Sequence, residues 1–139
     1  MDLIAGLTSI ACRAGSMETL ARLEAGIAAR GLSVFARIDH AALAAGAGLS
    51  LRPTTVVLFG NPKGGTPLMQ AAQTMGIDLP LKALVWQDEA GATWISYNEP
   101  KWLALRHQLP GADAIVEKLT GAVAAVAAEA AGSALLDSS

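Results

Sequence analysis

The sequence has little of three things that would point directly to a class of function: cysteine, histidine and charge. Its single cysteine, Cys12, excludes an intramolecular disulfide. The two histidines, His40 and His107, are not three or four residues from each other or from Cys12, so we predict no structural metal site. Haem ligation by His40 and a methionine such as Met75 has no specific support, and the cofactor stays unknown. There is no Gly-x-Ser-x-Gly motif, so no nucleophile is indicated.

Charged residues make up 16% of the chain, against an average of about 25%. Hydrophobic residues make up 53%, and the mean hydropathy is +0.42. The net charge is −2, and the ten lysines and arginines are scattered singly, which argues against nucleic-acid binding. A surface so poor in charge should expose an apolar patch. We therefore predict a homodimer that buries about 800 Å² per partner, an ordinary interface.

The ends of the sequence bear on compartment and domain limits. The N-terminus has no basic segment ahead of a long apolar run, so we expect a cytoplasmic protein. The Ala-rich tract 112–131 contains four charged residues and is too polar for a membrane span, so we expect no membrane association. The length fits a single domain over residues 1–132, followed by a loose tail at 133–139.

The stretch from Arg52 to Gly76 organises the chain. Residues 54–59 are apolar and β-branched, which predicts a buried strand with Leu58 and Phe59 in or beside the centre of the sheet. A glycine-rich turn is expected over 60–67, followed by a helix over 68–75 that Gly76 ends.

The predicted turn is the candidate ligand site. Gly64 and Gly65 would adopt positive φ, and the N–H groups of the turn from Thr66 to Met69 would face an anion, with Lys63 nearby. A P-loop mechanism does not transfer, because Lys63 precedes the glycine pair. The alternative is a purely structural turn.

Asp39 and His40 end an earlier strand, in the same relative position as Gly60 and Asn61. If the two strands are parallel neighbours, His40 and Asn61 face one pocket, where histidine could act as acid, base or ligand. The structural alternative is that His40 caps a short helix or binds a buried carbonyl.

Periodicity and turn residues predict the remaining elements. Together they indicate an α+β fold with two layers: a mixed five-stranded sheet with helices mainly on one face. The expected strands are 3–12, 32–38, 54–59, 81–87 and 92–97, and the expected helices are one after Ser16 that ends before Gly31, then 41–47, 68–75, about 99–107 and 112–131.

Several short motifs resemble those of the small bacterial family known as domain of unknown function 302. The resemblance covers roughly residues 7–109, with Glu99 where the family tends to have Asp, and it leaves the Ala-rich helix outside the family core. It implies a compact α+β fold, a tendency to dimerise and no assigned reaction. His40, Asn61 and the loop at Lys63 match recurrent family positions. The motifs are Ile38-Asp39-His40, Arg52-Pro53-Thr54-Thr55, Phe59-Gly60-Asn61-Pro62, Gly65-Thr66-Pro67-Leu68-Met69, Asp78-Leu79-Pro80-Leu81 and Tyr97-Asn98-Glu99-Pro100.

The sequence therefore favours a homodimer that binds a small ligand, with anions among the candidates, at His40, Asn61, Lys63, Gly64, Gly65 and Thr66. Two alternatives stay open. An enzyme would use His40 as acid or base and would need a carboxylate within reach. An interaction module would have no pocket there.

Overall fold

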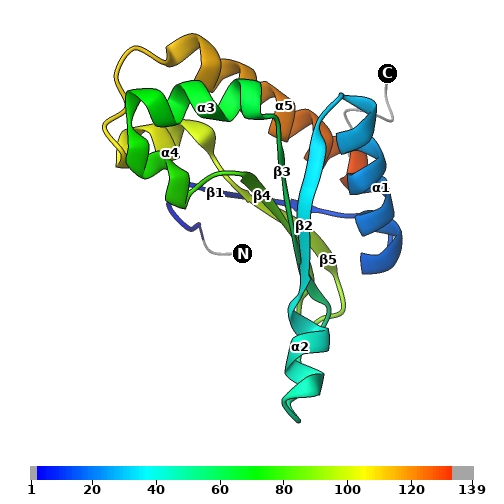
Figure 1. Ribbon diagram of the computed structural model, residues 1–139. Helices are drawn as coiled ribbons and strands as arrows, with labels where there is room; N and C mark the ends of the chain where they lie inside the picture. Colours follow the sequence, from blue (N-terminus) through cyan, green and yellow to red (C-terminus); the bar gives the residue numbers. More distant parts are fainter. Residues whose placement is uncertain (1–2, 133–139) are drawn as a thin grey trace.

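The computed structural model describes residues 3–132, so the predicted tail at 133–139 lies outside the described residues. Five strands form one sheet, with most of the helices at one end and on one side of it (Figure 1). The strands are β1 (Leu7–Ala11), β2 (Ser33–Asp39), β3 (Thr54–Gly60), β4 (Leu81–Gln87) and β5 (Thr93–Asn98). The helices are α1 (Ser16–Ala29), α2 (His40–Gly46), α3 (Pro62–Ala71), the 3-10 helix η1 (Gln73–Ile77), α4 (Pro100–Arg106) and α5 (Asp113–Ala131).

The sheet has the order β1-β5-β4-β3-β2, and each neighbouring pair is antiparallel. The predicted α+β class and the five strands are confirmed. The prediction of a mixed sheet is wrong, because β2 and β3 form a long hairpin whose connection carries α2. Such a hairpin needs no crossover helix between its strands, so α2 does not fold back over the sheet.

The main core lies between the sheet and the helices α1 and α5. On the core side of β3, Val57 and Phe59 are fully buried, and Leu23 and Ile27 of α1 meet the same cluster. Burial alternates along β3 and β4, as expected for strands with one side against helices. A second apolar cluster joins α3, η1, α4 and the first turns of α5, with Leu68 at its centre.

The short helix α2 is the exception to this packing. It projects from the end of the sheet opposite α3, α4 and α5 (Figure 1). It contains no buried residue. Asp39 is its N-cap and accepts a hydrogen bond from the N–H of Ala42 at 2.9 Å, so the alternative in which His40 caps this helix is wrong.

Two helix starts differ from the sequence expectation. The N-cap of α1 is Gly15 and not Ser16, which is the first helical residue. α3 begins at Pro62 instead of Leu68, so the predicted glycine-rich turn is helical. Proline suits the first helical position because its missing N–H has no partner to lose there.

Candidate functional site

The predicted site residues separate into two groups at opposite ends of the β2–β3 hairpin. Because these strands are antiparallel, Asp39 pairs with Thr55 while Ser33 pairs with Gly60. His40 therefore lies at one end of the hairpin, and Asn61 lies at the other. The prediction that His40 and Asn61 face a common pocket is wrong, because it assumed parallel strands.

The loop geometry predicted for the anion cradle is not formed, because the segment is helical and the N–H groups of Lys63, Gly64 and Gly65 already have partners. The Asn61 side chain accepts from the N–H of Lys63 at 2.9 Å, so it caps α3. The N–H groups of Gly64 and Gly65 both donate to the carbonyl oxygen of Asn61, at 2.9 and 3.0 Å. Neither glycine has a positive φ. Thr66 lies within α3, so its turn offers no free row of donors to an anion.

Two of the predicted residues nevertheless line a cavity. Gly65 and Thr66 face a space of about 220 Å³ between α3, the start of β2, the end of β3, the start of β4 and α5. Its walls are almost wholly apolar, so the chemistry of this cavity suits a hydrocarbon or aromatic group better than an anion. The full lining is Phe35, Gly60, Pro62, Gly65, Thr66, Met69, Leu79, Pro80, Leu81 and Leu119.

His40 lines a second, shallower depression of about 440 Å³ on the side of the sheet that faces away from α1 and α5. Lys82, Trp86 and Ser96 also line this depression. Within residues 3–132, the His40 side chain makes no hydrogen bond or ion pair, so no described carboxylate orients its ring. The carboxylate contact that an acid or base role for His40 would use is not formed among these residues.

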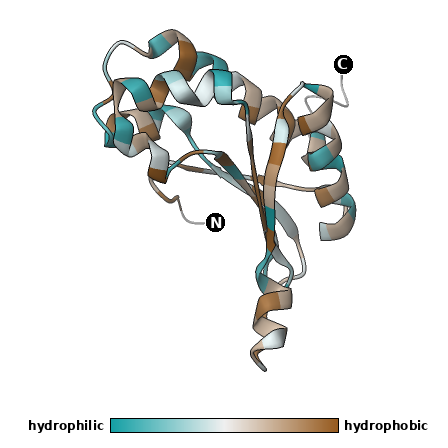
Figure 2. Cartoon of the chain, viewed as in Figure 1, coloured by the Kyte–Doolittle hydropathy of each residue, from teal (hydrophilic) through white to brown (hydrophobic). Residues whose placement is uncertain are grey.

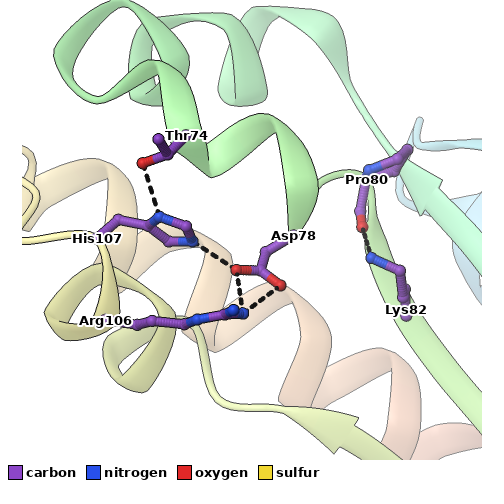
Figure 3. A network of polar contacts seen from close by, with 6 residues as sticks. All are labelled: Thr74, Asp78, Pro80, Lys82, Arg106 and His107. Atoms are coloured by element: carbon purple, nitrogen blue, oxygen red, sulfur yellow. Dashed lines mark hydrogen bonds and ion pairs between the residues drawn. The ribbon is translucent and has the colours of Figure 1, made fainter.

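A polar network that the sequence reasoning missed, with largely buried Asp78 and His107 at its centre, joins η1 to the end of α4 (Figure 3). The His107 ring lies between Thr74 and Asp78: its Nδ1 is 2.8 Å from the Thr74 hydroxyl oxygen, and its Nε2 is 2.5 Å from Asp78 Oδ2. Arg106 donates through one guanidinium nitrogen to both oxygens of Asp78, at 3.1 and 2.9 Å. The side chains of His107 and Asp78 are 7% and 13% exposed.

The partners fix the roles of the His107 nitrogens. The Asp78 carboxylate accepts, so Nε2 carries the proton, and Nδ1 then accepts from the Thr74 hydroxyl. The network satisfies four polar side chains and ties the segment before β4 to α4. Leu79 and Pro80, which follow Asp78, line the apolar cavity, so the network positions one cavity wall. The available sequence signals for this network were the Asp78-Leu79-Pro80-Leu81 motif and the adjacent residues Arg106 and His107. No pattern in the sequence indicated that these two segments contact each other.

Among the groups with shifted pKa values, Cys12 and Tyr97 lie in or beside the main core. Burial raises the pKa of the Cys12 thiol, which favours the unreactive protonated form. Burial and the charge of Glu99 raise the pKa of Tyr97, although its hydrogen bond with Thr8 lowers it. Within residues 3–132, no three His, Cys, Asp or Glu side chains gather to hold a metal ion.

Trp86 and Trp94 are paired across β4 and β5. Their ring centroids are 6.3 Å apart. The Trp86 indole donates to the Ser96 hydroxyl at 2.8 Å, and Ser96 is 2.7 Å from the Ser9 hydroxyl. These contacts are compatible with packing anchors.

Comparison with known proteins gives relatives of two kinds. Residues of this chain are 47% identical over 104 residues to "Fluoride-specific ion channel FluC 1" from Brucella suis biovar 1 (strain 1330), a match that covers 75% of this chain and 41% of that protein. The protein of the same name from Brucella abortus biovar 1 (strain 9-941) has the same identity, with 38% of its length covered. The chain thus spans about two fifths of these relatives. Among the helices that the structure describes, none combines the length and the apolar character needed to cross a membrane.

The fold matches a solved structure closely. The crystal structure of an uncharacterized conserved protein DUF302 from Bacillus stearothermophilus superimposes with a TM-score of 0.82, covers 91% of this chain and 99% of its own, and is 22% identical. The model of the family described as domain of unknown function DUF302 matches residues 9–126. The match extends beyond the predicted limit at residue 109 and includes most of α5. The chain therefore belongs to the DUF302 family, as its motifs indicated.

Proposed function

We propose that this protein is a homodimeric binding module that takes a small apolar ligand in the cavity beside α3. The observation that carries this proposal is the chemistry of the cavity wall. Of the side chains around it, the hydroxyl of Thr66 is the one polar group, and no charged residue lines it. Ligand sites in proteins are typically apolar hollows with a few polar groups that fix orientation.

The size of the cavity sets the size of the ligand. An apolar cavity of about 150 Å³ is enough to hold benzene in another protein. The space of about 220 Å³ beside α3 would take a molecule slightly larger, such as a six-carbon chain or a bicyclic aromatic. Lys63 follows Pro62, which is part of the cavity wall. A ligand with an apolar body and an acidic head group could therefore place its body in the cavity and its acidic group beside Lys63.

The proposed homodimer is supported by apolar side chains that remain exposed. Phe35, Leu43 and Leu49 are 50%, 64% and 68% exposed. An isolated leucine at the surface is ordinary, but the exposed leucines Leu43 and Leu49 lie close together in sequence on one uncharged segment, which is typical of an interface.

The test uses probes that separate apolar contact from charge. Hexanol, hexanoate and inorganic phosphate are titrated into the protein, and backbone amide chemical shifts are followed by NMR. Sodium fluoride is a fourth probe, with sodium chloride at the same ionic strength as its control, because the Brucella relatives are named as fluoride channels. We expect hexanol and hexanoate to shift amides at Gly65, Thr66 and Leu79, and phosphate and fluoride to leave them unchanged.

Neighbouring glycines of α3 supply a matched pair of variants. Gly65 lines the cavity, and Gly64 does not. A Cβ added at Gly65 would lie 3.7 Å from Leu79 Cδ1, an ordinary contact, so Gly65→Val fills the cavity without a clash at its first atom. Gly64→Val makes the same change in the same helix, with its Cβ 3.9 Å from Leu119.

We expect Gly65→Val to weaken hexanol binding at least tenfold, a loss of about 1.4 kcal/mol, while Gly64→Val keeps it. Lys63→Ala should weaken hexanoate binding and leave hexanol binding unchanged, with little effect on thermal stability because Lys63 is exposed. Equal binding by the two valine variants, or no shift with either six-carbon probe, would refute the apolar site. Shifts at Lys63 with phosphate alone would support the anion site instead.

A further inference from the structure

One side of the sheet, which we call the open face, is left partly exposed. It is the side opposite α1 and α5. Along β3 and β4 its side chains are half-buried, and they alternate with buried side chains that face the core. Register places them in cross-strand rows, since Leu58 pairs with Lys82 and Ile38 pairs with Val56. The open face comprises Leu7, Ser9, Ala36, Ile38, Val56, Leu58, Lys82, Leu84, Trp86, Trp94, Ser96 and Asn98.

The open face is apolar, although it lies at the surface. Lys82 is its one charged residue, and its two polar serines bond to each other and to Trp86. The depression of about 440 Å³ lies on this face. An apolar face of this extent costs free energy in water, and a monomer would leave it uncovered.

The second feature is the segment His40–Leu51, which we call the arm. It contains α2 and the residues after it, and it projects beyond the end of the sheet (Figure 1). Leu43, Leu49 and Leu51 are 64%, 68% and 48% exposed, and the arm carries no charged residue. Figure 2 shows apolar colour along β2 and in α2. The leucine side chains of the arm therefore stay largely in water, while Ala41 and Ala44 of α2 are half-buried.

We infer that the arm of one copy packs on the open face of a second copy, and that the second copy does the same in return. This inference rests on the homodimer of the proposed function and names its interface. His40, the first residue of α2, already lines the depression on its own sheet. The arm therefore leaves the domain at the rim of the face that it would cover on the partner. A two-fold axis near this rim exchanges the two arms and makes the contact self-complementary.

The dimensions agree. α2 has seven residues, a length of about 10 Å at 1.5 Å per residue. Lys82 to Trp86 of β4 spans about 13 Å of open face at 3.3 Å per residue. Five strands about 4.8 Å apart and about 20 Å long present a flat area of about 500 Å². An ordinary dimer buries about 800 Å² per partner, so the sheet alone falls short and the arm would supply the remainder.

Electrostatics also favour a second copy over a charged partner. The arm has no charge, and the open face has Lys82 alone, so neither surface could select an acidic or basic ligand strongly. The two surfaces are largely apolar and carry one charged residue between them, so each matches the other in a second copy.

The test is the oligomeric state of two matched variants, measured by sedimentation at tens of micromolar. Leu43→Glu places a charge on the arm. Met17→Glu makes the same kind of change at a residue of α1 that is 86% exposed, far more than Leu43. Circular dichroism checks that both variants fold. We expect the wild type and Met17→Glu to be dimers. The dimer dissociation constant of Leu43→Glu should be at least about a hundredfold higher, because two-fold symmetry places the substitution at both arm contacts of the dimer.

Disulfide trapping gives an independent measurement. In a Cys12→Ser background, one chain carries Leu43→Cys and another carries Leu84→Cys, and the two are mixed under mild oxidation. Formation of the mixed disulfide supports the inference. A wild-type dimer that persists in Leu43→Glu, without mixed disulfide, overturns the arm interface and leaves the homodimer standing. A monomeric wild type overturns both.

Discussion

Two adjacent residues of β3, Leu58 and Phe59, point to opposite sides of the sheet and should respond differently to truncation. Phe59 is fully buried in the core beneath α1 and α5. Leu58 lies on the open face and is half-buried. Replacing each with alanine removes a large apolar side chain from the same strand and the same local backbone.

The expected magnitudes follow from burial. Phe59→Ala should cost about 3 to 5 kcal/mol, since it removes a buried ring and leaves a cavity. For a chain of this size, 1 kcal/mol shifts Tm by about 3 to 5 °C, so Tm should fall by about 10 to 20 °C. Leu58→Ala should cost less in the monomer, about 1 to 2 kcal/mol, because part of its side chain remains in water.

The assay is urea unfolding at two protein concentrations, well below and well above the dissociation constant of the dimer. Phe59→Ala should lose the same free energy of unfolding at both concentrations. The loss for Leu58→Ala should grow with concentration, because an interface residue contributes to the dimer alone. A loss below about 1 kcal/mol for Phe59→Ala would refute the placement of the core. A concentration-independent loss for Leu58→Ala would remove this residue from the interface.

Three further predictions concern single residues. Gly6→Ala should cost about 1 to 3 kcal/mol more than Gly31→Ala in urea unfolding: both glycines have positive φ, but a Cβ at Gly6 would lie 2.3 Å from the Trp102 ring while one at Gly31 meets nothing within 4 Å. Similar losses would contradict this contact. Tyr97 is the only tyrosine, so its absorbance at 295 nm titrates alone. The pKa of Tyr97 is raised in the folded protein, so its contribution to stability should be present at neutral pH and disappear as pH rises above about 10. A titration midpoint in the folded protein equal to that in the urea-unfolded protein would contradict this prediction. Asp78→Asn should cost about 1 to 3 kcal/mol, because it weakens the hydrogen bonds of buried His107. Glu117→Gln, which breaks an exposed ion pair with Lys101, should hardly change the denaturant midpoint, and equal losses would show that the Asp78 network contributes nothing special.

Local signals in the sequence were enough for most elements. The apolar, β-branched run at 54–59 predicted β3, and Gly31 marked the end of α1, where it has φ of +71°. The strands expected at 81–87 and 92–97 are β4 and β5, which are joined by a short connection. In each case the residues that determine the structure lie within a few positions of one another.

The parts that failed depend on contacts between distant segments. Whether β2 and β3 run parallel or antiparallel is decided by the route of the connection between them, and the sequence of α2 does not reveal that route. The glycine pair at Gly64 and Gly65 suggested a loop, but Asn61 caps a helix start and Leu79 packs beside Gly65, so tertiary contacts make the segment helical. The network of Asp78 and His107 joins residues 29 apart in sequence, with no periodic pattern between them.

The hairpin of β2 and β3 separates two surfaces of this chain in space. At one end, Gly60 and Phe35 border the apolar cavity, and at the other end the chain leaves the sheet to form α2. Because α2 connects two paired strands and buries no residue of its own, the hairpin could close with a short turn in its place while the core stayed intact. Under the proposed arm interface, insertions, deletions and substitutions in this connection would change self-recognition without altering the cavity. The proposed partner surface and the proposed ligand site would then be inherited as separate modules.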